Sequence, residues 1–299
     1  MENHNSFIVA NTLPISLQEI HDKHIIPVFA KDNSALISQS QIIETALSAL
    51  SALGYAPDEP QIRVSHPIMG RTPDARFKQP SELLPHEITL YYERMMFLLK
   101  LPQVKSTVNG HELSLVVGGI KSYSWDNLGR DHKAQQHFKF FVGFQVWVCS
   151  NLCVSSDGAV LELKANSPHM ITSQIKEMME VYNPEKHLNW LEDLKNYDLT
   201  TSQFAHFLGR ASMQPYVKDS PGYSLSTTQA NSVVKGYYSD PHFSHKEDQI
   251  SLWNLYNLIT ESSKGAYIDG FLDRNVTGSK IVEDLRMSLK QGSPSWFLN

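Results

Sequence analysis

The hydrophobic pattern of this 299-residue chain changes its period once, close to residue 166. Before that point apolar residues alternate with polar ones or form short aromatic and β-branched runs, and after it they recur every three or four positions. A strand repeats every two residues and a helix about every 3.6, so the pattern predicts an α+β protein. We expect a strand-rich antiparallel half over residues 1–166, with one early helix, and a helical half over residues 167–299.

Two glycine turns organise the expected strands. Asn109-Gly110 and Asp157-Gly158 each stand between apolar runs, as in β-hairpins. Gly143 interrupts a long aromatic run and is expected to mark a bulge. The expected strands are residues 24–29, 61–66, 93–101, 112–118, 138–149 and 159–163.

Capping signals mark the expected helix starts. Ser38 with Gln41, and Thr200 with Gln203, have the spacing of a capping box. The stretch 213–228 is rich in Pro, Gly and Ser and is expected to be a loop. Helices are expected at residues 38–54, 167–182, 184–194, 200–211, 250–259, 267–272 and 280–289. The residues expected in the core of the helical half are Ile171, Met178, Tyr182, Phe204, Phe207, Leu208, Trp253, Tyr256 and Ile259.

Composition narrows the class of protein. Apolar residues make up 41% of the chain and no run of about 18 apolar residues occurs, so we expect no membrane contact. The first residues are polar rather than basic and then apolar, which favours the cytoplasm. Cys149 and Cys153 are too few for a disulfide framework, and in an extended strand they would lie about 13 Å apart. We therefore expect two reduced, buried thiols without a metal.

Charge is distributed unevenly. The whole chain has a net charge of -5, yet residues 61–139 hold eleven Lys and Arg against seven Asp and Glu, with aromatic residues among them. Cationic side chains bind phosphates and aromatic rings stack on bases, so this mixture favours nucleic-acid binding. The alternative is an ordinary surface whose charges are solvated. Residues 62–78 form the most arginine-rich part and are expected to be an ordered loop. The candidate nucleic-acid-binding residues are Arg63, Arg71, Arg76, Lys78, Tyr91, Tyr92, Arg94, Trp125, Arg130 and Lys133.

One short pattern suggests metal-dependent chemistry. Asp157, Glu162 and Lys164 would suit a nuclease in which the carboxylates hold Mg²⁺ and the lysine steadies the attacking water. A hairpin turn and the solvent side of a strand explain the same three residues without a metal. The chain has no G-x-S-x-G or P-loop motif. We expect no cofactor other than Mg²⁺ in the nuclease alternative, and favour a protein that is not an enzyme.

Several segments resemble, in order, an uncharacterised family of phage- and plasmid-type proteins, a domain of unknown function carried on conjugative and other mobile elements. They are RVSHPIMGRTP, YYERM, VGG, VCSNL, LTTSQFAHFLGRA, SLWNLYNLITE and YIDGFLDRNV. In broader relatives the last strand ends in V-C-N-N followed by Arg-His-Thr. Here Ser150 lies between Cys149 and Asn151, and the Arg-His-Thr is missing. The resemblance implies a mobile-DNA setting and supplies no catalytic residues.

Three functions follow as hypotheses. The first is a non-enzymatic nucleic-acid-binding factor of a mobile element, with single strands as one candidate ligand, in DNA transfer, replication or recombination. The second is a protein-interaction or inhibitor module that acts on a host defence protein, which the acidic balance favours. The third is the metal-dependent nuclease. A homo-oligomer is a further hypothesis, because symmetry would repeat a weakly charged surface and so form a groove that binds nucleic acid.

Overall fold

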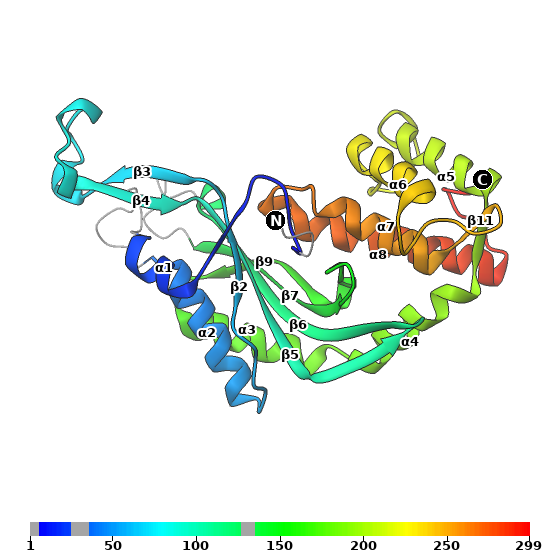
Figure 1. Cartoon of the computed structure of the whole chain (residues 1–299), viewed down its shortest axis with the longest axis horizontal. Coiled ribbons are helices and arrows are strands. Elements are labelled where there is room, and N and C mark those ends of the chain that lie inside the picture. Colours follow the sequence, from blue (N-terminus) through cyan, green and yellow to red (C-terminus); the bar gives the residue numbers. More distant parts are fainter. Residues whose placement is uncertain (1–5, 25–35, 127–134) are drawn as a thin grey trace.

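The computed structural model describes residues 6–24, 36–126 and 135–299. Its antiparallel strands fill the first half and its helices dominate the second, which confirms the α+β class (Figure 1). The strands are β1 (Leu13–Ile15), β2 (Gln61–Val64), β3 (Pro67–Arg71), β4 (Ile88–Tyr92), β5 (Arg94–Val108), β6 (His111–Ser122), β7 (Gln136–Val146), β8 (Leu152–Cys153), β9 (Ala159–Ala165), β10 (Asp198–Thr200) and β11 (Gln249–Ser251). The helices are α1 (Leu17–Lys23), α2 (Gln39–Ala52), α3 (Pro168–Val181), α4 (Pro184–Asp193), α5 (Thr201–Met213), α6 (Thr227–Ser239), α7 (Leu252–Ser263) and α8 (Ile268–Gln291).

One curved sheet forms the centre of the first half. Its strands lie in the order β1-β2-β5-β6-β7, with β8 and β9 following one another along the outer edge of β7. The expected hairpin at Asp157-Gly158 is therefore wrong, because β8 and β9 each pair with β7 and a short 3-10 helix over Ser156–Gly158 joins them. The hairpin at Asn109-Gly110 is confirmed between β5 and β6, with φ of 51° and 82° at these two residues.

Gly143 serves close packing rather than a bulge. It pairs in regular register with Val116 of β6, and the irregularity in β7 lies between Phe138 and Phe140, opposite β9. A Cβ atom at Gly143 would lie 2.4 Å from the carbonyl oxygen of Cys153. Only glycine lets β8 approach β7 this closely, so the expected bulge at Gly143 is wrong for a steric reason.

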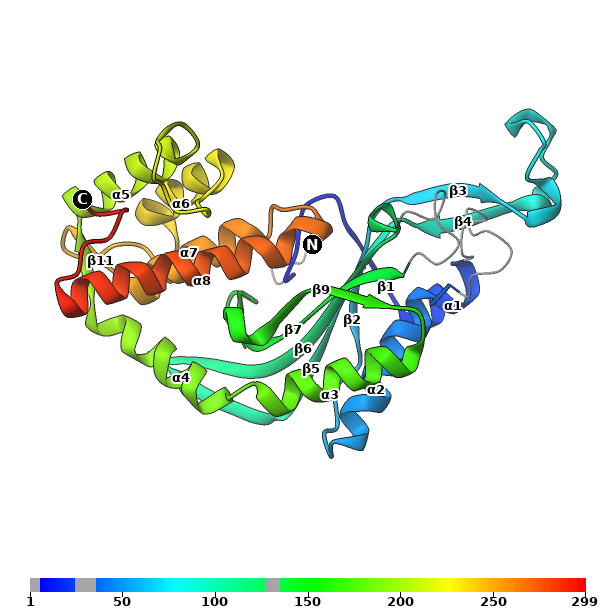
Figure 2. The same cartoon turned by 180° about the vertical axis from the view of Figure 1, so that it is seen from behind.

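Both faces of the sheet are covered by helices (Figure 2). Phe97 and Leu99 of β5 belong to a hydrophobic cluster that includes α2 and α3, whereas Met96 and Leu98 pack with Phe271 of α8. Neighbouring residues of a strand point to opposite faces, so β5 is apolar on both sides. The first cluster continues into α5, α6 and α7, so strands and helices share one hydrophobic interior.

The predicted helix starts at Ser38 and Thr200 are confirmed as complete capping boxes. Two expected helices, 267–272 and 280–289, are one helix, α8, because the residues between them include no proline and Gly278 packs against Ile259 of α7. Helix α6 begins inside the expected loop 213–228, at a capping box formed by Ser226 with Gln229. Of the nine expected core residues of the helical half, eight are buried and Leu208 is half-buried.

The β3–β4 hairpin leaves the body as a separate two-stranded ribbon, at the end opposite α5 and α6 (Figure 1). We call residues 67–92 the arm; the connection 72–87 forms its tip.

The expected strand at 61–66 ends at Val64, and the expected strand at 24–29 lies outside the described residues except for His24. None of the described helices combines the length and the apolar composition needed to cross a membrane.

Candidate functional site

The arginine-rich stretch supplies β3 and the tip of the arm. The tip is held together by Glu87, whose carboxylate accepts from the backbone of Leu84 at 2.8 Å and from Nζ of Lys78 at 2.5 Å. The Lys78 ammonium lowers the pKa of Glu87, with the backbone bond from Leu84 acting in the same direction. The expected ordered loop over residues 62–78 is wrong in part, because the stretch includes the end of β2 and all of β3, and the connection at the tip begins only at residue 72.

Three of the candidate cations gather at this tip. The Arg71 guanidinium donates to the backbone carbonyl of Lys78, which draws the base of the tip together. The Arg76 guanidinium lies 4.7 Å from the centre of the Phe77 ring. Phe77 is 84% exposed, so its ring is offered to solvent with a cation beside it.

Three other candidates are buried or half-buried in the body of the protein. Arg63 donates to the side chain and the backbone carbonyl of Thr12, and burial lowers its pKa. Tyr91 and Tyr92 are each 7% exposed, so neither offers an open ring face. These residues hold β2 and the base of the arm in place rather than forming a groove with the tip.

The remaining candidates lie apart from the tip. Arg94 pairs with Asp269 of α8 at 3.3 Å. Trp125 is half-buried, with Nζ of Lys139 at 4.8 Å from its ring centre. Arg130 and Lys133 lie outside the described residues.

The three residues of the nuclease alternative are not brought together as a metal site. Glu162 and Lys164 lie on the exposed side of β9, whereas Asp157 precedes β9 and pairs with Lys186 of α4 at 3.4 Å. Within residues 6–24, 36–126 and 135–299, no group of three His, Cys, Asp or Glu side chains is placed to hold a metal ion.

Both cysteines are free thiols in apolar surroundings. Cys153 is buried and Cys149 is half-buried. Burial raises the pKa of Cys149 to about 11 and raises that of Cys153 as well. The expected burial is thus complete for Cys153 and partial for Cys149.

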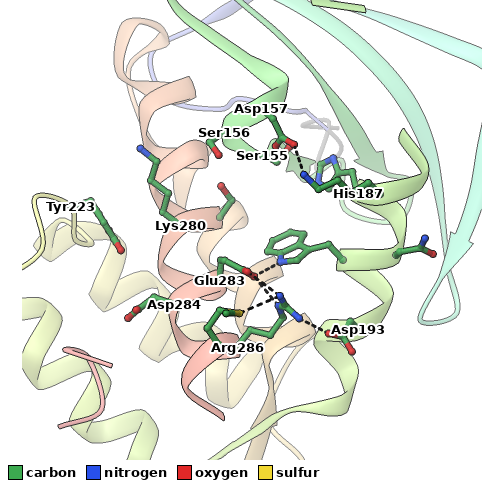
Figure 3. A pocket seen from close by; sticks show the side chains of 15 residues that line it. Ser155, Ser156, Asp157, His187, Asp193, Tyr223, Lys280, Glu283, Asp284 and Arg286 are labelled. Carbon is green, nitrogen blue, oxygen red and sulfur yellow. Dashed lines mark hydrogen bonds and ion pairs between the residues drawn. The ribbon is translucent and has the colours of Figure 1, made fainter. Parts of the chain in front are cut away.

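A cavity of about 1140 Å³ lies between α4 and α8 (Figure 3). Ser155, Ser156 and Asp157, from the connection before β9, close one end of it, and Tyr223, from the connection between α5 and α6, lies across from α4. Helix α8 contributes Lys280, Glu283, Asp284 and Arg286 along one wall, and helix α4 contributes Lys186, His187, Asn189, Trp190 and Asp193 along the other.

Arg286 ties the two walls together. Its guanidinium lies 2.6 Å from a carboxylate oxygen of Asp193 on α4 and 2.7 Å from one of Glu283 on its own helix. Glu283 also accepts from Nε1 of Trp190 at 2.6 Å. Burial works against ionisation of Glu283, but Arg286 and Trp190 outweigh it and lower the pKa of this carboxyl. The cavity walls are therefore held at fixed separation by charged hydrogen bonds.

His187 lies at the inner side of this cavity and is 5% exposed. Its Nδ1 atom is bonded to the hydroxyl of Tyr182 at 2.5 Å, while its Nε2 atom has no hydrogen-bond partner within the part of the chain that the structure describes. Burial lowers the pKa of His187 to about 4, although the charge of Asp157 acts in the opposite direction. The ring is therefore neutral near pH 7.

Sequence reasoning missed this cavity. Trp190 and Glu283 are separated by 93 positions in the chain, and no local pattern connects them. The sequence carries one weak indication of the cavity, the three-residue spacing of Glu283 and Arg286, which is typical of an ion pair on one helix face. By itself this spacing indicates only a surface exposed to solvent.

The fold and these two sites define an α+β protein with a projecting arm and a ligand-sized cavity. Residues 1–298 match a family model described as "Domain of unknown function, B. Theta Gene description (DUF3871)", and the chain belongs to this family. No curated protein and no solved structure matches the chain significantly.

Proposed function

We propose that this protein binds single-stranded nucleic acid through the tip of the arm and catalyses no reaction on it. The observation that carries the proposal is the Phe77 ring, 84% exposed at the end of a projecting hairpin, with the Arg76 guanidinium at 4.7 Å. Base stacking on an exposed aromatic ring contributes about 1–3 kcal/mol per base and tolerates any sequence. Unpaired bases offer the faces that such a ring requires.

The tip supplies few cations, so attraction to phosphate groups contributes little to the expected free energy of nucleic-acid binding. Arg71, Arg76 and Lys78 are close together, and Lys78 is partly neutralised by Glu87. Three phosphate contacts predict that log K falls against log salt with a slope of about -2 for a single strand. The hydrogen bonds of Glu87 fix the tip before binding, which lowers the entropy lost when a ligand orders it.

The biological setting is also part of this proposal. The segments that resemble phage- and plasmid-type proteins support a role in DNA transfer, replication or recombination of a mobile element, performed in the cytoplasm. A homo-oligomer would present several arms to one strand and add their weak contacts.

Anisotropy titrations with fluorescent single- and double-stranded DNA at several salt concentrations test the proposal. Phe77→Ala is expected to weaken single-strand binding about 10-fold with an unchanged salt slope, because a ring carries no charge. Arg76→Ala is expected to reduce the magnitude of the slope by about 0.7. Trp147→Ala, at a tryptophan 63% exposed on another surface, is the control and is expected to change neither.

A second candidate is a protein-interaction module, favoured by the apolar character of the same arm. Met69 is 71% exposed and Leu84 is 49% exposed, and Ile68 and Ile88 are also exposed. Exposed apolar side chains on a preformed hairpin suit a protein surface such as that of a host defence protein. Absence of DNA binding by the unaltered protein at low salt would reject the first proposal in favour of this one.

A further inference from the structure

The cavity between α4 and α8 has the dimensions of a small-molecule site. Its volume of about 1140 Å³ lies slightly above the range of roughly 300–1,000 Å³ that is usual for small-molecule pockets. It lies at the end of the molecule away from the arm (Figures 1 and 3). A ligand here would leave the arm free, so this site is independent of the proposed nucleic-acid contact.

Trp190 gives the cavity a rigid aromatic wall. Its indole N–H is fixed by Glu283 at 2.6 Å, and its ring packs edge-on against Tyr256, which is buried. Tyr223 contributes a second, half-buried ring from the α5–α6 connection. A flat ring fixed before binding suits the apolar face of another ring.

The lining carries a net charge of -1, and most of its charged groups are paired with one another. Its four carboxylates are Asp157, Asp193, Glu283 and Asp284, and its three cations are Lys186, Lys280 and Arg286. Arg286 pairs with Asp193 and Glu283, and Lys186 pairs with Asp157. His187 adds no charge near pH 7 because burial lowers its pKa to about 4. A wall whose charges are mostly paired and whose net charge is slightly negative has no general attraction for phosphate groups.

Several groups that donate and accept hydrogen bonds lie along the same wall. The hydroxyls of Ser155, Ser156 and Ser279 and the amide of Asn189 can each donate and accept, while the carboxylates only accept. At the inner end, Nε2 of His187 is buried without a partner within the described part of the chain. Almost none of this atom's surface is accessible, so the hydroxyl of Ser156 and the amide of Asn189, both exposed, are the polar groups that a ligand in the cavity reaches.

A neutral ring with several hydroxyl groups meets all of these conditions. We propose that the cavity binds an uncharged ligand built on a sugar ring, with one ring face against Trp190 and hydroxyl groups at Asn189 and Ser156. Two sources share this chemistry, a free saccharide and a nucleoside. Both have an apolar ring face, and each of their hydroxyl groups can donate one hydrogen bond and accept another.

Isothermal titration calorimetry of the full chain tests this with two neutral panels and their charged counterparts. Maltose and N-acetylglucosamine form the saccharide panel, and adenosine and uridine form the nucleoside panel. N-acetylglucosamine 6-phosphate and adenosine monophosphate are the charged counterparts. We expect one neutral panel to bind with a Kd below about 1 mM and its phosphorylated counterpart to bind at least tenfold more weakly. Which panel binds identifies the source.

Variants locate the binding. Tyr223→Ala and Asn189→Ala alter exposed or half-buried side chains and should fold, and each is expected to weaken binding at least fivefold. Trp190→Phe keeps a ring on the wall and should weaken it less than Trp190→Ala does. Trp147→Ala, outside the cavity, is the matched control and should leave the Kd unchanged. No binding by either neutral panel, tighter binding of a phosphorylated probe, or equal affinity in all cavity variants would overturn the proposal.

Discussion

The hydroxyl oxygen of Tyr182 lies 2.5 Å from Nδ1 of His187, and both side chains are only 5% exposed. The bond links the end of α3 to the inner side of α4, at the bottom of the α4–α8 cavity. It satisfies one ring nitrogen and fixes the direction of the other. A histidine held neutral in this way makes the stability of the fold depend on pH.

Stability is expected to fall as the pH drops from about 6.5 to about 4. Burial lowers the pKa of His187 to about 4, and that of His24 to about 4, from the ordinary value of 6.5. Between these pH values His187 and His24 bind a proton in the unfolded chain but not in the folded chain. The free energy of unfolding therefore decreases with falling pH. Each of the two histidines should lower the free energy of unfolding by about 2 kcal/mol between pH 6.5 and pH 5. Urea unfolding at these two pH values measures this difference.

The control is a substitution on the same helix that changes no titratable group. His187→Gln should remove about one proton from the pH slope, whereas Asn189→Ala, at an exposed position of α4, should leave the slope unchanged. Equal slopes in all three proteins would contradict the assignment of the pH dependence to His187.

Loss of one partner of the buried ion pair between Lys121 and Asp126 should be costly. The two side chains are 0% exposed and their charged atoms lie 2.5 Å apart. Lys121→Met leaves a buried carboxylate unpaired, which should cost about 3–5 kcal/mol. Lys164→Met, on the exposed side of β9, should change stability by less than about 0.5 kcal/mol. Adding Asp126→Asn to Lys121→Met should restore part of the loss, and chemical denaturation measures all three variants.

Two glycine-to-alanine substitutions should act in opposite directions. At Gly143 the new Cβ would lie 2.4 Å from the carbonyl oxygen of Cys153, so Gly143→Ala should destabilise the protein by more than about 1 kcal/mol. At Gly209, on the exposed side of α5, nothing lies within 4 Å of the new atom. Gly209→Ala should therefore raise the free energy of unfolding by about 0.5–1 kcal/mol. A melting temperature that moves the same way in both variants would be inconsistent with this packing.

Substitution of two phenylalanines, one buried and one exposed, distinguishes a role in core packing from a role in ligand binding. Phe207 is 0% exposed, and Phe207→Ala should cost about 3–5 kcal/mol of stability. Phe77 is 84% exposed, and Phe77→Ala should leave the melting temperature nearly unchanged while weakening nucleic-acid binding. Thermal unfolding of the two variants beside the unaltered protein gives the comparison.

The thiols should react slowly. Burial raises the pKa of Cys149 from 9.0 to about 11, which reduces the thiolate fraction about 100-fold near neutral pH. Labelling with a thiol reagent should therefore be slow in buffer and fast in urea. An added cysteine at exposed Ser81 of the arm, made by Ser81→Cys, is the positive control. Rapid labelling of Cys149 and Cys153 in buffer would contradict their burial.

Local signals in the sequence predicted local structure. The Asn109-Gly110 turn and the capping boxes at Ser38 and Thr200 each depend on a few neighbouring residues, and the structure confirms them. The pairing of β8 and β9 with β7 depends on tertiary contacts instead. A two-residue turn signal at Asp157-Gly158 cannot distinguish a hairpin from two strands laid along one edge.

The candidate site shows the same limit. Arg71, Arg76 and Lys78 are close in sequence and stay close at the tip of the arm. Arg63 is separated from Thr12 by 51 positions, so its internal bonds were invisible in the sequence. Tyr91 and Tyr92 point to opposite sides of β4, and both are buried because both sides are covered. The sequence shows which side chains can bind a ligand, and the tertiary fold decides which of them remain accessible.

The double covering of the sheet has a consequence for how the chain is made. Strand β5 is complete at Val108, but the helix that covers its Met96 and Leu98 side, α8, begins only at Ile268. A ribosome adding about 5–20 residues per second needs many seconds to bridge that interval. Throughout that delay the nascent sheet carries a bare apolar face, so we expect chaperone dependence during synthesis. A chain interrupted before α8 should accumulate as insoluble aggregate rather than as a smaller folded protein.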